Sequence, residues 1–306
     1  MTPYAPPHKT RGRPLYKATL AMLCAIMLWA SSGSASKLAL DYVTVPEGVA
    51  FRIVGAALLM WFIGLVVLRK SYRIKSPRPL VMGVLEPGLV TFFIMAGVSQ
   101  TSAVNAAVVW GIMPVTQPIL GRLVLGEPIR SSVAVGAVLA VCGTALLFFT
   151  KQQDGSGTMT GDLLLLCAVG CASVNQLLAR VVAKAEQNPL VTTSYQLLTA
   201  SVVASIFLAF NLPEGDLYAG VDVSTSLLLL ALITTTAGPF FLYNYAMQTM
   251  TVGRVSLFAP LSGPIGAIIA TAVFDEPVHA FVVVAVLMSL GGALCPTLAA
   301  RRTKQA

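Results

Sequence analysis

Ten long apolar segments run along the chain and are separated by short polar stretches. A helix needs about 20 apolar residues, at a rise of about 1.5 Å each, to cross a hydrocarbon core about 30 Å thick. We place ten such helices at residues 17–40, 46–68, 79–98, 102–125, 130–150, 161–185, 189–210, 224–247, 251–274 and 278–299. The pattern therefore predicts an all-α integral membrane protein with ten transmembrane helices.

The composition excludes a water-soluble enzyme. Of the 306 residues, 56% are hydrophobic and only 10% are charged, and the mean hydropathy is +0.81. Soluble proteins average about 25% charged residues. With so little polar surface, we expect the lipid bilayer to be the solvent of this chain.

The excess of basic residues indicates an orientation in the membrane, because its members lie in short clusters between apolar segments. The net charge is +8. With a cytoplasmic N-terminus, 17 of the 20 Lys and Arg residues fall on the inner side, and Lys37, Arg52 and Lys151 fall on the outer side. This bias predicts cytoplasmic N- and C-termini in a bacterial inner membrane, and gives no reason to expect a nucleic-acid partner.

The sequence offers no metal, cofactor or catalytic site. Its five cysteines all lie inside apolar segments, and none forms a CxxC pair. We interpret them as small buried hydrophobic residues. The two histidines lie in the N-terminal tail and in a short loop, so a histidine-built site is not expected.

The two halves of the chain resemble each other. Phe92-Phe93 and Gln100-Thr101 recur as Phe240-Phe241 and Gln248-Thr249, a shift of 148 residues. Glu127-Pro128 recurs as Glu276-Pro277 after 149 residues, and Lys37 matches Arg180 after 143. Because each copy contains five helices, an odd number, the second copy must be inverted in the membrane. We divide the chain into a basic tail (1–16), a first repeat (17–150), a polar linker (151–160), a second repeat (161–300) and a second basic tail (301–306), and expect the two inverted-topology five-helix repeats to enclose a central cavity.

Prolines interrupt corresponding helices of the two repeats. Pro114 and Pro118 lie in the fourth segment, and Pro260 and Pro264 lie in the ninth. A proline lacks an amide hydrogen and frees a carbonyl one turn earlier, which must face protein or a wet cavity. These helices are either simply kinked for packing or are parts of a gate near a midplane site, and their matched placement favours the gate.

Polar and aromatic residues at membrane depth cluster near those interruptions. They suit a mostly apolar pocket for a small amphipathic molecule. For the serines the alternative is helix packing, and for the tryptophans it is lipid contact. The candidate substrate-binding residues are Trp29, Ser32, Glu86, Asn105, Trp110, Gln117, Asn175, Gln176, Tyr195, Tyr243 and Asn244.

Charged residues near the membrane have both functional and structural interpretations. Glu86 is about 12 Å in from Arg78 at helical rise, where it either exchanges a proton or binds a substrate ammonium, or else bonds the chain disturbed by Pro87. Lys37 and Arg52 are possible gating residues, the alternative being interfacial ion pairs near Asp41 and Glu47. Glu127 and Glu276 suit the first turn of the following helix, so we take both as structural.

Four stretches form a recognisable set: Trp29 with the small residues that follow it, "VAFRIVGAALL" around Arg52, "MPVTQPILGRLVLGEPIRSSVAVGAVLAVCGTALLFF", and the second copy "APLSGPIGAIIATAVFDEPVHAFVVVAVLMSLGGALC". Together they resemble the EamA-type drug/metabolite transporter superfamily over about residues 17 to 299. The resemblance implies ten helices in two inverted repeats around a cavity, and the export of amino acids, related metabolites or drugs. Bacterial aromatic amino-acid exporters are a comparison within this family.

The second copy departs from the pattern, because Ala172 replaces the equivalent of Trp29 and Tyr195 replaces that of Arg52. A glutamate in the first helix, as in the small multidrug relatives, is absent. The proton-coupling mechanism of those relatives therefore does not carry over.

The sequence thus favours a secondary transporter that exports a small amphipathic metabolite, with neutral or aromatic amino acids as the leading class, by alternating access. The alternative is a proton-coupled drug or nucleoside-type exporter that uses Glu86, and a membrane-embedded enzyme is a remote third. The expected partners are a small-molecule substrate and the lipid bilayer. Monomer and homodimer both remain open.

Overall fold

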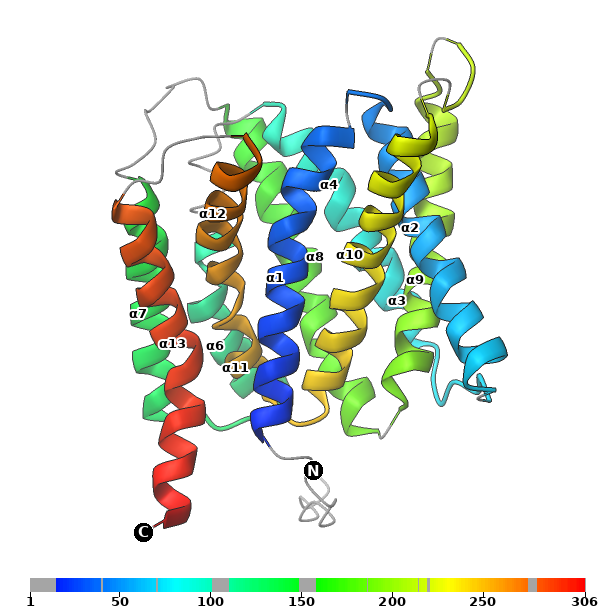
Figure 1. Ribbon diagram of the computed structural model, residues 1–306. Coiled ribbons are helices and arrows are strands. Elements are labelled where there is room, and N and C mark those ends of the chain that lie inside the picture. Colours follow the sequence, from blue (N-terminus) through cyan, green and yellow to red (C-terminus); the bar gives the residue numbers. More distant parts are fainter. Residues whose placement is uncertain are drawn as a thin grey trace.

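The computed structural model describes residues 15–39, 41–69, 71–100, 110–148, 158–185, 187–213, 215–218, 221–274 and 280–305, and all regular structure in these ranges is helical (Figure 1). The first half contains α1 (Leu15–Ala39), α2 (Val45–Phe62), η1 (Ile63–Val67), α3 (Arg78–Gly83), η2 (Val84–Leu89), α4 (Val90–Val98), α6 (Met113–Leu125) and α7 (Ser131–Phe148). The second half contains α8 (Met159–Lys184), α9 (Pro189–Phe210), α10 (Val223–Met247), α11 (Val252–Ser256), η3 (Ala259–Leu261), α12 (Ser262–Phe274) and α13 (Ala280–Gln305).

Consecutive short elements join into longer rods, so that the described residues form ten. One rod consists of α2 and η1, a second of α3, η2 and α4, and a third of α11, η3 and α12. Each remaining helix forms a rod of its own. Seven spans within the described residues are long and apolar enough to cross a membrane by themselves. The expected ten-helix architecture is confirmed, and most helix ends lie within a few residues of those predicted.

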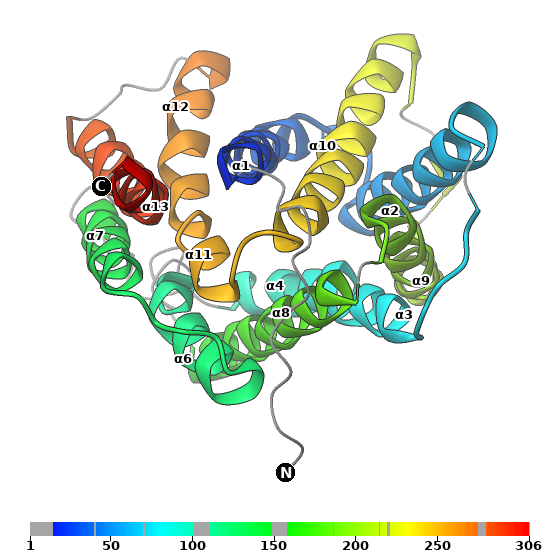
Figure 2. The same ribbon diagram turned by 90° about the horizontal axis from the view of Figure 1, so that it is seen from below.

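The packing of the rods has the symmetry of an inverted repeat. Helix α1 packs against α10 and α12, and its counterpart α8 packs correspondingly against α4 and α6. The pairs α2 with α9 and α7 with α13, each made of counterparts, also pack together (Figure 2). Helix α1 runs away from the end of the bundle where both termini lie, whereas α8 runs towards it. We call this end the terminal end.

Two close contacts between α7 and α13 show the same symmetry at single residues. A Cβ on Gly136 would lie 2.6 Å from the backbone oxygen of Gly292, and a Cβ on Gly143 would lie 3.1 Å from the backbone oxygen of Ala285. A shift of 149 residues converts Gly136 into Ala285 and Gly143 into Gly292, so each contact is the repeat image of the other. The absence of side chains at these glycines lets the two helices meet backbone to backbone.

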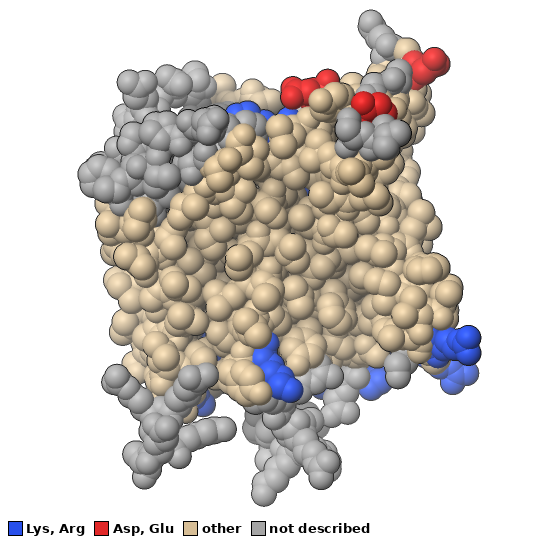
Figure 3. Space-filling view, viewed as in Figure 1, with Lys and Arg blue, Asp and Glu red and all other residues tan. Residues whose placement is uncertain are grey.

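The charged residues of the described chain lie mainly at the two ends of the bundle (Figure 3). Basic side chains gather at the terminal end in this view and acidic ones at the opposite end. The exposed Arg69, Arg73 and Arg78 lie between the end of η1 and the start of α3, and the exposed Asp41 and Asp216 lie between α1 and α2 and between α9 and α10. A tan, uncharged band separates the basic and acidic groups in this view. Such a band is what a lipid-facing surface requires.

The helix interruptions partly follow the prolines. In the ninth rod, the 3₁₀ turn η3 contains Pro260, and in the fourth rod a turn at Ile112 precedes Pro114. Residues 112 and 260 are 148 apart, so these two breaks correspond. In the third rod the break lies at Glu86, next to Pro87, whereas α10 continues through Pro239. The third and eighth rods therefore differ, because their prolines do not occupy equivalent positions.

Candidate functional site

The helix break in the third rod places Glu86 at the centre of a polar network. Glu86 has extended backbone angles, φ −143° and ψ 122°, between helical neighbours. Its backbone oxygen accepts a hydrogen bond of 2.8 Å from Nε2 of Gln196 in α9. A side chain from the other repeat therefore satisfies a carbonyl that the broken helix leaves free.

The carboxylate of Glu86 also binds the second repeat. Nδ2 of Asn175, which is fully buried in α8, donates a hydrogen bond of 2.7 Å to Oε2 of Glu86. No lysine or arginine in the described part of the chain forms an ion pair with this carboxylate. The backbone of Glu86 is thus part of a structural bond, and its carboxylate has no counter-ion among the described residues.

The network continues from Gln196 across to α10. Nδ2 of Asn244 donates to Oε1 of Gln196 over 2.9 Å and to Oγ1 of Thr193 over 3.0 Å. Gln196 and Thr193 were not among the residues predicted to bind substrate, although they are three positions apart on α9 and so share one face. This spacing was the feature of the sequence that could have identified both residues as part of the network.

Several buried polar atoms in this interior have no hydrogen-bond partner. They belong to side chains that sequence reasoning selected, on α6, α8 and α10. The atoms are Nε2 and Oε1 of Gln117, Oδ1 of Asn175, Oε1 of Gln176 and the hydroxyl of Tyr243. Because an unpaired buried polar group is costly, each of these atoms calls for a physical explanation.

Aromatic rings line the network on the side of α1 and α10. The Trp29 ring lies 5.5 Å from that of Phe240 in an edge-to-face arrangement and 6.1 Å from that of Tyr243 in a tilted one. Tyr243 packs in the same buried cluster as Met82, which lies four residues before Glu86. The structure groups Trp29 with Tyr243, and it groups Glu86 with Asn175 and, through Gln196, with Asn244.

Arg52 and Ser32 form a second polar cluster, nearer the end opposite the termini. The Arg52 guanidinium donates to Oγ1 of Thr236 over 2.9 Å, to Oγ of Ser32 over 2.9 Å and to Oγ of Ser36 over 3.4 Å. The structure records no ion pair between Arg52 and Glu47, which was the alternative interpretation of Arg52. Glu47 is buried at the start of α2, where it accepts hydrogen bonds from Thr44 and from the backbone of Tyr218.

Three further candidate residues lie on α1, on α9 and just before α6. Trp110 packs against the apolar cluster of Val90, Leu165 and Val169. The Tyr195 hydroxyl donates to the backbone oxygen of Tyr72 over 2.9 Å. Lys37 is exposed in the last turn of α1. Asn105 lies outside the described residues. All the candidate substrate-binding and gating residues remain predictions.

A buried ion pair joins the two repeats at the terminal end. Nε of Arg180 in α8 lies 2.7 Å from Oε1 of Glu127, and Nζ of Lys184 lies 3.7 Å from the same oxygen. The other oxygen of Glu127 accepts a 2.9 Å hydrogen bond from the backbone N–H of Val252, the first residue of α11. We name these contacts of Glu127 with Arg180 and Val252 the clasp. Glu127 therefore caps a helix of the other repeat, and its expected place in the first turn of α7 is wrong.

The helices around the clasp pack closely. A Cβ on Gly121 in α6 would lie 3.6 Å from Cβ of Val252, and one on Gly253 would lie 3.0 Å from Pro118. The largest buried apolar cluster, which includes Met22, Met82, Met247, Met250 and Phe258, joins helices of both repeats at the same end. Pro118, a predicted gating residue, thus lies where the terminal end is closed. Of the other three, Pro114 and Pro264 are buried near the starts of α6 and α12, and Pro260 lies in η3.

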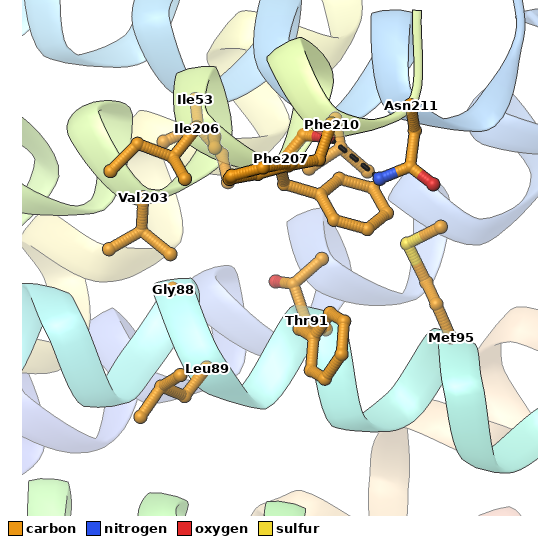
Figure 4. A pocket seen from close by; sticks show the side chains of 13 residues that line it. Ile53, Gly88, Leu89, Thr91, Met95, Val203, Ile206, Phe207, Phe210 and Asn211 are labelled. Atoms are coloured by element: carbon orange, nitrogen blue, oxygen red, sulfur yellow. Dashed lines mark hydrogen bonds between the residues drawn. The ribbon is translucent and has the colours of Figure 1, made fainter.

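An apolar groove of about 390 Å³ lies apart from these polar clusters, between α2, α9 and the rod that contains η2 and α4 (Figure 4). Ile53, Val203, Phe207 and Phe210 line it, and the Asn211 amide at its edge donates to the backbone oxygen of Phe207 over 2.8 Å. None of the predicted substrate-binding residues lines it. Its surface suits a hydrocarbon chain better than a polar substrate.

Comparisons with known proteins agree with this architecture. The model of the EamA-like transporter family matches residues 16–149 and again residues 159–297. The "Uncharacterized transporter YyaM" of Bacillus subtilis (strain 168) is 25% identical over 84% of this chain and 86% of its own length. The "Uncharacterized transporter YetK" of the same organism is 22% identical over 90% of this chain and 85% of its own. A crystal structure of a protein that is 20% identical superposes with a TM-score of 0.78, covering 94% of this chain and 99% of that one, which shows the shared fold.

Proposed function

The chain belongs to the EamA-like transporter family, and on that premise we propose that it is a secondary transporter that exports small amphipathic metabolites across the bacterial inner membrane by alternating access. Neutral or aromatic amino acids are the substrate class that we favour. The observation that carries the proposal is the polar network around Glu86, which is built from side chains of both repeats within a membrane-spanning bundle. Any rearrangement between the repeats must change this network.

The closed terminal end supports alternating access. The clasp and the apolar cluster seal the bundle at the end where both termini lie. Two structurally similar halves can exchange conformations, so that closure at one end alternates with closure at the other. The repeat counterparts of Glu127 and Arg180 are Glu276 and Lys37, of which Glu276 lies outside the described residues.

The charge distribution supports a cytoplasmic location of the terminal end. Exposed basic side chains gather there, and cytoplasmic loops are enriched in Lys and Arg. With this orientation, the conformation seen here is closed towards the cytoplasm. Transport by such a cycle needs no chemical change of the substrate, so we assign no enzymatic activity.

A proton-coupled exporter is the second candidate, and one observation favours it. Glu86 is the one acidic residue of the described network, and it has no basic partner there. Intramembrane carboxylates of this kind are common in proton relays. Substrate movement and proton movement would then be linked through the same side chain.

Uptake into liposomes that contain the purified protein tests both candidates. The panel consists of labelled amino acids, a labelled nucleoside and a cationic dye, each with and without an imposed pH gradient. Equilibration of an amino acid regardless of the gradient supports facilitated export. Accumulation above equilibrium only with the gradient, abolished by Glu86→Gln, supports proton antiport. Rates equal to those of protein-free liposomes for every compound would contradict transport of these classes.

A further inference from the structure

The geometry points to a protonated amine as the group that the Glu86 network recognises, with Glu86 and Asn175 binding the ammonium and Trp29 and Tyr243 lining its surroundings. This inference rests on the proposed function, because it assumes that a small molecule enters the space between the repeats. It adds the chemical group by which that molecule is selected.

The pair of Glu86 and Asn175 offers hydrogen-bond acceptors to a ligand. Asn175 uses its Nδ2 to donate to Oε2 of Glu86, so its own Oδ1 remains, fully buried and without a partner. Oε1 of Glu86 likewise receives no hydrogen bond from the described residues. Two free acceptors are therefore held on side chains that are bonded to each other. An ammonium group has three N–H donors and no acceptor, and so matches such a pair.

The charge of Glu86 also favours a cationic ligand. A carboxylate at membrane depth is costly unless it is paired, and no described lysine or arginine pairs with Glu86. Arg52 is engaged with the hydroxyl groups of Ser32, Ser36 and Thr236 in a separate cluster. A bound ammonium would supply the missing counter-charge. A ligand whose only charged group is a carboxylate would instead be repelled by Glu86.

Aromatic groups lie close to this pair. The Tyr243 hydroxyl is buried and lacks a hydrogen-bond partner, and Tyr243 packs in the same buried cluster as Met82, four residues before Glu86. The Trp29 ring, half-buried on α1, lies 6.1 Å from the Tyr243 ring. Aromatic faces attract organic cations and also contact apolar parts of a ligand. An amine attached to an apolar or aromatic body suits this combination.

Four compounds that share a phenyl ring and a short chain separate the contributions of charge. They are 2-phenylethylamine, L-phenylalanine, 3-phenylpropionate and 2-phenylethanol, and binding to the purified full-length protein is measured by isothermal titration calorimetry at pH 7. We expect the two compounds with an ammonium group to bind about tenfold or more tightly than the other two, because a hydrogen-bonded charge pair is lost in the latter. Equal binding of 3-phenylpropionate or 2-phenylethanol, or no binding of either ammonium compound, would overturn the inference.

Variants of the protein test whether Glu86 and Asn175 bind the amine. Glu86→Gln removes the charge and should weaken binding of 2-phenylethylamine about tenfold to a hundredfold. The matched control Asp216→Asn makes the same chemical change in an exposed loop and should leave binding unchanged. Should Glu86→Gln fail to fold, as judged by its thermal melt, Asn175→Ala is measured instead, with a weakening of at least severalfold expected. Unchanged amine binding in a folded variant at position 86, or at position 175 where that variant replaces it, would contradict the assignment.

The binding and transport experiments test amine recognition and transport separately. If 2-phenylethylamine binds in a Glu86-dependent way but none of the four compounds crosses the liposome membrane, the recognition is correct and the proposed transport is wrong. If the compounds cross at rates that do not depend on an ammonium group, the proposed transport is supported and the recognition is wrong.

Discussion

Oε1 of Glu127, in the connection between α6 and α7, lies 2.7 Å from Nε of Arg180 in α8, so that a buried ion pair fastens the first repeat to the second. The side chains on the two sides of the pair are only 7% and 12% exposed. Glu127 also holds the N–H of Val252 at the start of α11. One carboxylate thus links three parts of the terminal end, and its contacts must break or rearrange for that end to open.

Glu127→Gln should make the terminal end open more often. The substitution removes the charge that pairs with Arg180 but keeps an oxygen for the Val252 N–H, so the closed conformation should lose about 3 kcal/mol. A cysteine introduced at the fully buried Ser256, in a chain without its five native cysteines, reports opening through its labelling by a membrane-impermeant maleimide from that side. We expect faster labelling in Glu127→Gln.

The control for this experiment is Lys184→Gln. The Lys184 side chain is 45% exposed and 3.7 Å from Glu127, and exposed pairs of this kind contribute little. Labelling should therefore stay near the rate of the parent chain. An equal rate in Glu127→Gln and in the parent would show that the clasp does not hold the end closed.

Alanine at Gly136 or Gly292 should destabilise the fold. The added Cβ would lie 2.6 Å from the opposing backbone oxygen, which forces α7 and α13 apart at a cost of about 1 to 3 kcal/mol. The midpoint of thermal unfolding in detergent measures the effect. Gly291→Ala is the matched control, because it is the same change one residue away with nothing within 4 Å of the new Cβ. Similar melting of all three variants would argue against the close helix contact.

Gln196→Leu should destabilise the protein by about 1 to 3 kcal/mol, because it leaves the Glu86 carbonyl and a donor of Asn244 without their partner. The thermal midpoint again provides the measurement. Gln100→Leu serves as control, since the exposed Gln100 side chain, two residues beyond the end of α4, donates to the backbone oxygen of Ala96. A loss of stability at position 100 equal to that at position 196 would mean that the network adds nothing beyond a surface substitution.

The helices could be predicted from the sequence because length and apolarity decide membrane insertion. Helix α9, at Pro189–Phe210, has the predicted bounds, and α10 begins one residue earlier than predicted and ends at the same residue. The C-terminal extent of the last helix was underestimated. It continues to Gln305, since basic residues beyond the apolar segment extend a helix into water as readily as they end it.

The partners within the site could not be predicted, because they depend on how helices rotate when they pack. Glu86 and Asn175 are 89 positions apart, and nothing in their spacing joins them. Tyr195 and Gln196 are neighbours on α9, yet a rotation of about 100° per residue sends Tyr195 to Tyr72 and Gln196 to Glu86. Tyr72 lies in a stretch between two apolar segments, and the hydrophobic pattern of such a stretch does not indicate that it contacts Tyr195.

The central claim, transport through opening and closing of the terminal end, is tested most directly by locking that end. Gly121→Cys and Val252→Cys place two sulfurs on Cβ atoms about 3.6 Å apart in the closed conformation, a separation that suits a disulfide. Both cysteines are introduced into a chain without its native cysteines. Each single variant shows the effect of its substitution on uptake in the absence of the disulfide. Oxidation of the double variant should reduce uptake into liposomes to that of protein-free liposomes, and reduction should restore it. Full cross-linking with undiminished uptake would contradict the account.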